Sequence, residues 1–353
     1  MLPPPRSRAA RSDRPALARR DLPPPPSLGN RKSVRVSRSC MRLVLFGQAA
    51  FGQRVLAGLR DAGHEIALVY APTEADPLGQ EATKAGVPLR TPKSYKTPEV
   101  AAEVSGAAAD LGVLAFVTKI IPQTVIDAPR LGSICFHPSL LPKYRGGNAL
   151  AWQLIRGETR GGFTVFWTDP GIDTGPILLQ REVAIAPEDT AGSLYFDKIF
   201  EAGIAGMVDS VNLIAAGKAP REAQDESQAS YDPLCTDEHA AIRFGAPARA
   251  VYDLIRGCDP QPGAHALWNG EVLRFYGPKR VERGAADAGQ LPGTVLSIGA
   301  KEIVLAAGTG AEAGAIAVGR VRIGKDKLAA GEAAERAGIA PGSVLGDGAV
   351  SPR

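Results

Sequence analysis

The sequence predicts an α/β protein with a mostly parallel, doubly wound sheet, followed by a smaller C-terminal β-barrel. From residue 41 onward, short apolar runs alternate with helical periodicity, and near-continuous apolar strands are typical of a parallel sheet covered on both faces. Beyond residue 235, short strand-like segments separated by glycine and asparagine indicate a small barrel. The 353 residues are enough for two domains with substantial cores.

A strand followed by a helix opens the predicted sheet. The segment RLVLFG at 42–47 is apolar throughout, and Phe51, Val55 and Leu59 then recur every four residues on one side of a helix. Further strands are predicted at 65–71, 87–89, 110–117 and 133–137, with helices between them at 77–86 and 98–109. Ligands bind beyond the carboxyl ends of the strands in such sheets, and His137 lies at one of these ends.

Two further strands and a long helix complete the predicted sheet domain. The strands FTVFW at 163–167 and ILLQREVAI at 177–185 lie on either side of a turn-rich loop, and a helix is predicted over 190–216. One side of that helix carries apolar residues at helical spacing: Phe200, Ile204, Met207, Val211 and Ile214. The polar segment 217–233 has no periodicity, so it is interpreted as a linker without regular structure.

The C-terminal domain is predicted to begin with a helix at 246–257. Its strands are predicted at 263–268, 271–277, 293–298, 302–307 and 315–323. The expected organisation is therefore an N-terminal extension (1–40), a sheet domain (41–220), a linker (221–235) and a barrel domain (236–348).

Residues 1–40 are rich in proline and arginine. They hold eight prolines and ten Lys or Arg residues against two aspartates, so they bury too little apolar surface to offset their ordering entropy and are predicted to be disordered. An upstream extension, a nucleic-acid-binding tail and a transit peptide all fit this composition. Without this segment the net charge changes from +4 to a slightly negative value, so the rest of the chain has no overall basic character.

Cysteine usage and hydropathy favour a cytoplasmic protein. The four cysteines, Cys40, Cys135, Cys235 and Cys258, form no CxxC pair and no disulfide framework. The longest apolar stretches are far shorter than the roughly 20 residues that span a bilayer, so no membrane association is expected. The oligomeric state is not determined by the sequence.

The segment SICFHPSLLPKYRGG at 133–147 contains a cysteine and a histidine two positions apart. Because side chains alternate along a strand, Cys135 and His137 point the same way. A thiol and a base are the groups that covalent catalysis needs. However, same-face neighbours lie about 6–7 Å apart at Cα, and buried cysteines are common as small hydrophobic residues. A Cys–His nucleophile is therefore less favoured than a single working histidine.

A metal site and a phosphate-binding loop are both disfavoured. His137, Asp169 and Asp173 are the obvious ligands, and no HxxxH or CxxC spacing adds to them, so no metal is expected. GQAAFGQR at 47–54 lacks the Lys-Ser/Thr ending of a P-loop and the GxG start of a dinucleotide site, so no NAD(P) is expected. Its glycines are expected to permit a tight turn and close packing of the helix.

The loop DPGIDTGPI at 169–177 carries two carboxylates between strands. Because Asp, Pro and Gly all favour turns, an ordinary turn is one interpretation. The loop shares its domain with a strand-end histidine, so a carboxylate that orients an imidazole and helps position water is another.

HPSLLPKYRGG at 137–147, followed by GGFTVFWTDPGIDTGPILLQ at 161–180, resembles the folate-dependent formyltransferase family. This family includes glycinamide ribonucleotide formyltransferase, methionyl-tRNA formyltransferase and the N-terminal hydrolase domain of 10-formyltetrahydrofolate dehydrogenase. The resemblance covers about residues 41–345 and is closest to the hydrolase domain, through FGQAAFGQ, ADPLGQEATKAGVP and LIRGCDPQPGAHALWNG among others. It implies a Rossmann-like domain, an OB-like barrel and 10-formyltetrahydrofolate as substrate, with no further cofactor.

The resemblance also implies roles for particular residues. His137 is similar to the family's catalytic histidine and Asp173 to its essential aspartate, which is also expected at the folate. Lys119, Ile120 and Ile121 are similar to residues that line the folate pocket. In this scheme a protonated His137 stabilises the tetrahedral oxyanion and then supplies a proton to the leaving N10, while Asp173 holds the imidazole and a water.

Cys135 departs from the pattern of most transferases in the family, which have asparagine at this position. A thiol cannot provide the strong donor of an amide, and the hydrolase domain likewise has an apolar residue there. Hydrolysis, or transfer to an unusual acceptor, is therefore favoured over transfer to a common amine. Because no aldehyde dehydrogenase region follows the barrel, oxidation of the formyl group to carbon dioxide is not expected.

Several alternatives stay open. A methionyl-tRNA formyltransferase would need a basic surface for tRNA, and the segments 277–283 and 319–327 contain clustered Lys and Arg residues. A non-catalytic folate-binding module and an enzyme that formylates a nucleotide-linked sugar or another amine are further alternatives.

Overall fold

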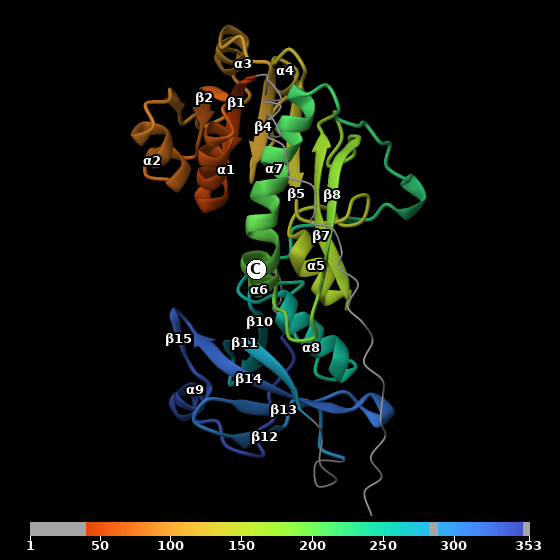
Figure 1. The fold of residues 1–353 in the computed structure, drawn as a ribbon. Helices are drawn as coiled ribbons and strands as arrows, with labels where there is room; N and C mark the ends of the chain where they lie inside the picture. Colours follow the sequence, from red (N-terminus) through yellow and green to blue (C-terminus); the bar gives the residue numbers. More distant parts are fainter. Residues whose placement is uncertain (1–39, 282–288, 349–353) are drawn as a thin grey trace, which may run out of the picture. The chain divides into compact units, whose positions relative to one another are not determined.

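The computed structural model describes residues 40–281 and 289–348, so residues 1–39 of the predicted extension lie outside the described residues. A seven-stranded sheet has the order β3-β2-β1-β4-β5-β7-β8 (Figure 1). Its strands are β1 Arg42–Gly47, β2 Glu65–Tyr70, β3 Leu89–Arg90, β4 Leu111–Ala115, β5 Ser133–His137, β7 Arg160–Trp167 and β8 Ile177–Ala184. Neighbours from β3 to β5 are parallel, whereas β7 is antiparallel to both β5 and β8. The predicted mostly parallel sheet is confirmed.

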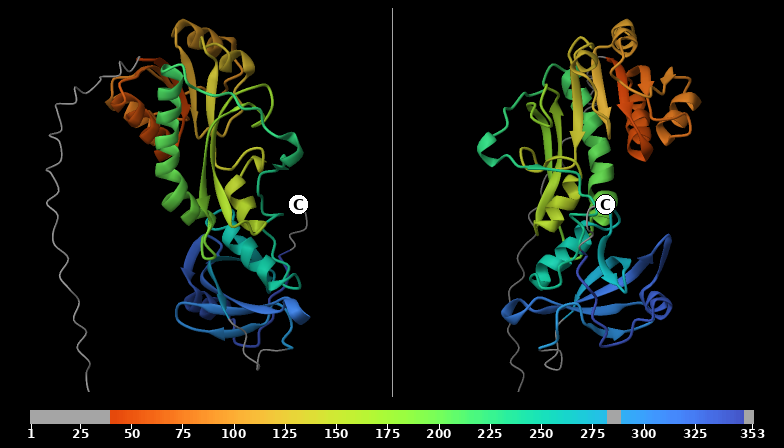
Figure 2. Two further views of the ribbon diagram at one scale, coloured as in Figure 1. Left: turned by 45° about the vertical axis from the view of Figure 1, so that its right-hand side comes forward. Right: turned by 180° about the vertical axis from the view of Figure 1, so that it is seen from behind.

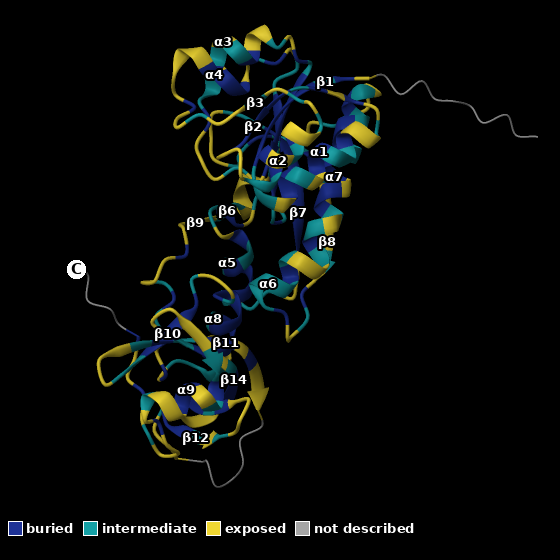
Figure 3. Ribbon diagram, turned by 90° about the vertical axis from the view of Figure 1, so that its left-hand side faces the viewer, coloured by how far each residue is buried: buried dark blue, intermediate teal, exposed yellow. Residues whose placement is uncertain are grey.

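Helices cover both faces of this sheet. They are α1 Ala49–Asp61, α2 Pro77–Lys84, α3 Pro98–Gly106, α4 Gln123–Ile126, α5 Ala149–Ile155, α6 Ala191–Ser193 and α7 Phe200–Ala215. On β1, Leu43 and Leu45 join the core that includes α1 and α7, while Val44 and Phe46 join the core that includes α3 and α4. Helices α1 and α7 lie side by side (Figure 2), and the strands between the layers are buried (Figure 3). In the described ranges, no helix combines the length and apolar composition needed to cross a membrane.

The turn between β1 and α1 is tightly packed. A Cβ on Gly47 would lie 2.6 Å from the Ala115 carbonyl oxygen, so this close approach requires glycine, as expected. The Asp76 carboxylate accepts hydrogen bonds from Ala49 N at 3.0 Å and from Leu78 N at 2.9 Å. A protein carboxylate therefore occupies a backbone donor at the start of α1, where a phosphate-binding loop would hold a phosphate.

The helix predicted over 190–216 contains a π-helical turn, Leu194–Ile199, between α6 and α7. The predicted apolar stripe begins at Phe200, after this turn, so it does not reveal the turn; the buried residues of the turn, Leu194 and Ile199, are five positions apart. Gly203 lets α7 approach the sheet closely, since a Cβ there would lie 2.6 Å from the Phe136 ring.

The predicted linker is ordered by polar contacts. Glu222 forms a β-bridge with Ile177, a 3-10 turn spans Glu226–Gln228, and β9 (Tyr231–Asp232) pairs in parallel with β6 (Arg145–Gly146). The prediction that this segment lacks regular structure is wrong, because polar side chains rather than an apolar stripe hold it in place.

The C-terminal region forms an antiparallel sheet in the order β10-β11-β14-β13-β12, with β15 paired to β14. Its elements are α8 Ala248–Gly257, β10 Ala264–Trp268, β11 Glu271–Val281, β12 Val295–Ile298, β13 Ile303–Ala307, a 3-10 turn Gly310–Glu312, β14 Gly314–Ile323, β15 Asp326–Ala329 and α9 Ala330–Ala337. Bridges join Leu267 to Gly346 and Thr294 to Val344, so one segment links the β10 edge to the β12 edge as barrel closure requires. The five predicted strands are confirmed, whereas the sequence pattern does not predict β15 and α9.

Candidate active site

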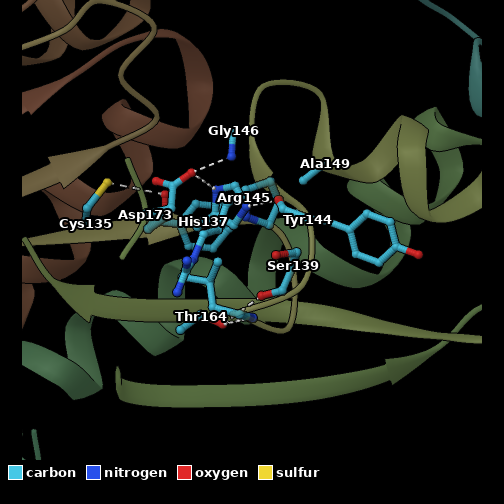
Figure 4. A network of polar contacts seen from close by, with 12 residues as sticks. Cys135, His137, Ser139, Tyr144, Arg145, Gly146, Ala149, Thr164 and Asp173 are labelled. Carbon is cyan, nitrogen blue, oxygen red and sulfur yellow. Dashed lines mark hydrogen bonds and ion pairs between the residues drawn. The ribbon is translucent and has the colours of Figure 1, made fainter. Parts of the chain in front are cut away.

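His137 is the last residue of β5, at the carboxyl edge of the parallel strands. Strand β5 pairs with β4 on one side and with β7 on the other, where Thr164 is the partner of His137. Only 7% of the His137 side chain is exposed. The sequence prediction that this histidine ends a strand is therefore correct, and the strand places it against the loops that follow β5 and β7 (Figure 4).

Both ring nitrogens of His137 face oxygen atoms. Nε2 lies 2.7 Å from the Tyr144 carbonyl oxygen, and Nδ1 lies 3.4 Å from Asp173 Oδ2. The same Oδ2 accepts a hydrogen bond from Gly146 N at 2.8 Å (Figure 4). The structure thus brings the two predicted catalytic residues together, with one ring nitrogen tightly bound and the other at a longer distance.

This geometry fixes where the imidazole carries its hydrogen atoms. A carbonyl oxygen only accepts, so Nε2 must donate to Tyr144. In a neutral ring the lone pair of Nδ1 would then face the Asp173 carboxylate, and two acceptors would oppose each other. The contact between Nδ1 and the carboxylate is attractive only when Nδ1 also carries a proton.

The loop after β5 is held by buried hydrogen bonds. Thr164 Oγ1 donates to the Ser139 carbonyl at 2.7 Å, which anchors the loop to β7. Tyr144 adopts a left-handed φ of 61°, and its hydroxyl donates to Glu158 at 2.7 Å. Burial first, and then this hydrogen bond, raises the pKa of the Tyr144 phenol, so the side chain stays neutral. The residue that supplies the carbonyl to His137 is therefore fixed at both its backbone and its ring.

Asp173 and Asp169 have different surroundings within one loop. Asp173 has a left-handed φ of 56° and directs its carboxylate to His137. Asp169 Oδ1 instead accepts from Gly171 N at 3.1 Å and from Thr174 Oγ1 at 2.7 Å, so it closes its own turn.

In the part of the chain that the structure describes, no three His, Cys, Asp or Glu residues are grouped so that they could hold a metal ion.

The Cys135 thiol is unsuited to act as a nucleophile. It points toward Asp173 on the same side as His137 (Figure 4). Burial, and to a smaller extent the charge of Asp173, raises the pKa of the Cys135 thiol well above its usual range. Because the thiolate is the reactive form, a thiol held protonated argues against the Cys–His alternative.

The predicted folate-contacting residues follow β4. Since Leu114 of β4 pairs with Cys135 of β5, this segment leaves the sheet at the same edge as His137. Ile120 is 77% exposed, whereas Ile121 is buried in the core beside α3 and α4. Lys119 is exposed, and its ammonium group donates to the Lys93 carbonyl at 3.4 Å. Of the three, Lys119 and Ile120 present side chains to the solvent.

Sequence reasoning misses a second group of residues next to Asp173. Arg145, which is 7% exposed, pairs with both carboxylate oxygens of Glu226 at 2.6 and 2.9 Å. Gln224 lies between Arg145 and the backbone of the Asp173 loop. The signal available in the sequence is a polar run, AQDES at 223–227, in a segment without periodicity. That signal does not indicate which distant loop the side chains reach.

Comparison with known proteins identifies the family of this chain. The family profile described as "Formyl transferase" matches residues 41–211, and "Formyl transferase, C-terminal domain" matches residues 235–338. Methionyl-tRNA formyltransferase of Geotalea uraniireducens (strain Rf4) is 32% identical over 317 residues, which cover 87% of this chain and 98% of that protein. The chain belongs to the formyl transferase family. The resemblance inferred from the two motifs is therefore confirmed.

Within the formyl transferase family, other relatives match a shorter part of this chain. Cytosolic 10-formyltetrahydrofolate dehydrogenase of Mus musculus is 45% identical over 245 residues, which cover 67% of this chain and 27% of that protein. Cytosolic 10-formyltetrahydrofolate dehydrogenase of Xenopus tropicalis is 42% identical over 259 residues, which cover 71% of this chain and 29% of that protein. The chain thus spans less than a third of the dehydrogenases that it matches.

Solved structures with low sequence identity share the formyl transferase fold. HypX from Aquifex aeolicus, in complex with tetrahydrofolic acid, aligns with a TM-score of 0.62 at 20% identity over 85% of this chain and 48% of that chain. The N-formyltransferase from Helicobacter canadensis, in complex with folinic acid and dTDP-3-aminofucose, aligns with a TM-score of 0.60 at 16% identity over 79% of this chain and 99% of that chain. These alignments confirm the predicted Rossmann-like sheet followed by a smaller antiparallel domain.

Proposed function

We propose that this protein removes or transfers the formyl group of 10-formyltetrahydrofolate, leaving tetrahydrofolate, with His137 and Asp173 as its acid–base pair. The observation that carries the proposal is a buried imidazole whose Nδ1 faces a carboxylate 3.4 Å away. Relatives named for 10-formyltetrahydrofolate, and neighbours crystallised with tetrahydrofolic or folinic acid, support the folate substrate. The proposed compartment is the cytoplasm; relatives of similar identity are named both cytosolic and mitochondrial.

The reaction begins with attack of water or an amine on the formyl carbon. The carbonyl oxygen then becomes an oxyanion on a tetrahedral carbon, and a donor placed beside that charge lowers the barrier more than most other single contacts. Collapse of this intermediate breaks the bond from carbon to N10, which must receive a proton. The products are tetrahydrofolate and either formate or a formylated amine.

His137 Nδ1 is the proton donor in this scheme. Nε2 is bound to the Tyr144 carbonyl at 2.7 Å, so its hydrogen is held in place. The 3.4 Å between Nδ1 and Asp173 Oδ2 exceeds the usual range for an N–H···O hydrogen bond, so the Nδ1 proton is held less tightly. Asp173 balances the imidazolium charge and accepts the proton that the attacking water or amine loses; this proton then returns to His137 Nδ1, 3.4 Å away, and restores the pair.

We further propose that Lys119, Ile120 and Ile121 contribute to the folate site, together with Asp173. The exposed Ile120 side chain supplies apolar contact area for the planar folate ring, and Lys119 supplies a positive charge beside it. Ile121, which is buried, supports the backbone of this segment from the core. Folate is the substrate, and the reaction as written requires neither a metal nor NAD(P).

Cys135 bears on the choice of acceptor. Its thiol is protonated, weakly polar and close to the reacting groups, so it adds no strong donor for an oxyanion. Water therefore remains the favoured acceptor over an ordinary amine. A Cys135→Asn variant restores the amide common among the transferases and is expected to raise transfer to amines relative to hydrolysis; an unchanged ratio would contradict this role.

The decisive experiment measures turnover of 10-formyltetrahydrofolate with water alone and with a panel of amine acceptors, following tetrahydrofolate by absorbance. The wild-type protein should release the formyl group, and His137→Ala should lose about 10²–10⁴-fold in rate. Full activity in His137→Ala would eliminate the proposed pair. Tight folate binding without turnover under any acceptor would instead support a non-catalytic folate-binding module.

A methionyl-tRNA formyltransferase is the second candidate, since that relative aligns over 98% of its length. Three basic residues, Arg320, Arg322 and Lys327, gather at the edge of β14 and β15, where Lys327 Nζ lies 3.5 Å from the Tyr276 ring centroid. Among the described residues, none of these three forms an ion pair. Burial lowers the pKa of Lys327; the charge of Asp259 opposes this effect, and the two neighbouring arginines add to it. A nearby phosphate would relieve the repulsion among the three cations.

Charged initiator tRNA separates the two enzymes. Incubation of the protein with this tRNA and 10-formyltetrahydrofolate should yield formyl-methionine if the second candidate is correct. Its absence, together with formate release, would leave the hydrolytic activity.

A further inference from the structure

Gln224 uses its whole amide group to join two loops of the site. Its Nε2 donates to the Asp173 carbonyl at 2.8 Å and to the Gly175 carbonyl at 2.7 Å. Its Oε1 accepts from Arg145 Nε at 3.2 Å and from Arg145 Nη2 at 2.8 Å. An amide has two donor hydrogens and two acceptor lone pairs, and all four are used here.

The partners of Gln224 allow one orientation of the amide. Arginine only donates and backbone carbonyls only accept, so the oxygen must face Arg145 and the nitrogen must face Asp173 and Gly175. A glutamate would keep the contact to Arg145 but place a carboxylate oxygen against two carbonyl oxygens. A leucine or methionine would fill the space with none of the four bonds. The site therefore distinguishes glutamine from residues of similar size.

The backbone that Gln224 holds is in an unusual conformation. Asp173 has φ +56°, a left-handed conformation that costs a non-glycine residue about 1–3 kcal/mol and persists only when its surroundings enforce it. On the far side of the loop, Gly175 packs so closely that a Cβ would lie 1.7 Å from the Trp167 carbonyl oxygen. Gln224 thus closes the open side of a loop that is already anchored to the end of β7.

Arg145 connects the same amide to the other loop of the site. Its guanidinium is held by Glu226, whose hydrogen bond is the main reason that the pKa of Arg145 is raised, and the charges of Asp169 and Asp173 add to this effect. The next residue, Gly146, donates its N–H to Asp173 Oδ2. Gln224 therefore binds the Asp173 backbone directly. It also binds Arg145, the residue next to Gly146, whose N–H donates to the Asp173 carboxylate.

We propose that Gln224 is a positioning residue of this reaction: it holds Asp173 in its left-handed conformation, so that the carboxylate stays aligned with His137 Nδ1. Gln224 does not contact either catalytic side chain, and it acts through the Asp173 and Gly175 carbonyls. This inference rests on the function proposed above for the His137–Asp173 pair.

The test compares Gln224→Glu and Gln224→Met with the wild-type protein, with Gln228→Ala as the matched control. The Gln228 amide donates to Asp225 in the same segment, at 2.7 Å, and is exposed. Steady-state kinetics with 10-formyltetrahydrofolate, thermal unfolding and ¹⁵N NMR of the His137 imidazole, assigned with His137→Gln, are measured on each. Both Gln224 variants should lose about 10- to 100-fold in kcat with KM changed less than about threefold, as expected for a misplaced catalytic group. Gln228→Ala should match the wild type.

The NMR measurement separates this inference from the proposed function. In the wild type, the Nδ1 chemical shift should report the nearby Asp173 carboxylate, and both Gln224 variants should change that shift while staying folded. If the wild type turns over no formyl group, the proposed function fails, and an unchanged Nδ1 signal in the variants would still overturn the positioning role. Unchanged kcat in both folded variants would also overturn it, as would a loss of kcat that only follows a loss of folded protein.

Discussion

Two contacts between a basic and an acidic side chain have opposite properties in this molecule. His137 and Asp173, at the edge of the parallel sheet, are separated by 3.4 Å, and their side chains are 7% and 17% exposed. Asp253 and Arg256, on α8, are separated by 2.6 Å and are 5% and 1% exposed. The first pair joins the end of β5 to the irregular loop after β7 at a distance beyond the usual hydrogen-bond range, whereas the second is short and lies on a regular helix.

The surroundings of the second pair explain its role. Arg256 Nη1 also donates to the carbonyls of Ala186 and Asp189, at 3.4 and 3.3 Å, and Tyr252 on the same helix donates to Pro187 at 2.7 Å. These bonds attach α8 to the segment that follows β8. The ion pair on α8 is saturated with hydrogen bonds and holds one element against another, whereas the His137–Asp173 pair is the one for which we propose a role in catalysis.

The largest effect is expected from Asp173→Asn, which breaks the first pair with little change in volume. The amide keeps an acceptor for Gly146 N but removes the charge that balances the imidazolium, so kcat should fall by about 10²–10⁴-fold. Steady-state kinetics below the unfolding temperature provide the measurement. A fall in thermal stability large enough to account for the whole loss of activity would contradict a role of the His137–Asp173 pair in catalysis rather than in stability.

Breaking the Asp253–Arg256 pair should lower stability and leave the activity of the folded protein unchanged. Arg256→Met removes one of the two arginines that pair with Asp253 and the donor to the Ala186 and Asp189 carbonyls, so we expect a loss of about 1–3 kcal/mol of unfolding free energy. Denaturant unfolding measures this loss, and the double variant with Asp253→Leu should recover a large part of it. The activity of each folded molecule should stay close to the wild-type value, and a specific loss of kcat would contradict the division of roles.

Thr164→Val should affect both stability and activity, because Thr164 is buried and also anchors the loop that contacts His137. Its hydroxyl donates to Ser139 and accepts from Leu141 N at 3.1 Å, so valine leaves two backbone groups without these partners. We expect a loss of about 1–3 kcal/mol in unfolding free energy, with a modest fall in kcat since the loop carrying the Tyr144 carbonyl relaxes. Urea unfolding and kinetics on one preparation distinguish a loss of both stability and kcat from a loss of stability alone or of kcat alone.

The smallest effect concerns an ion pair near the surface. A hydrogen bond from Arg274 lowers the pKa of Asp237, so this pair adds stability above the unfolded-state pKa of about 4 and loses it as pH falls through the lower folded-state value. Because Asp237 is more than half exposed, Asp237→Asn should lower the unfolding temperature only slightly at pH 7. The difference from wild type should shrink toward pH 3, and a difference that grows would contradict the assignment.

The sequence predicts those parts of the molecule that periodicity and strand ends determine. The apolar pattern of β1, in which Leu43 and Val44 reach opposite cores, already indicates a sheet covered on both faces. His137 is identifiable because it ends an apolar strand, and Asp173 because its loop matches a family motif. Both predictions depend on information within a few neighbouring residues.

The missed features depend on contacts between distant residues. Gln224 belongs to a polar run without periodicity, and nothing near it in the sequence indicates that its amide meets Asp173, 51 positions earlier. The π-helical turn lies before the predicted apolar stripe, which begins at Phe200, so the stripe gives no sign of it. The Tyr144 carbonyl is a backbone atom, so its side chain gives no sign that it binds His137. Predicting these features requires the tertiary structure.

The attachment of the 220–232 segment to the site has a consequence for the order of folding. Gln224 reaches Arg145 across 79 positions of the chain, and Ser230 reaches Tyr144 across 86, so both contacts form only after a long loop closes. During synthesis from the N-terminus, the sheet strands emerge well before these residues. A nascent chain that has reached only residue 211 lacks Gln224 and Ser230, which bind the two loops of the site. The geometry of the proposed catalytic pair is therefore among the last features of this domain to form.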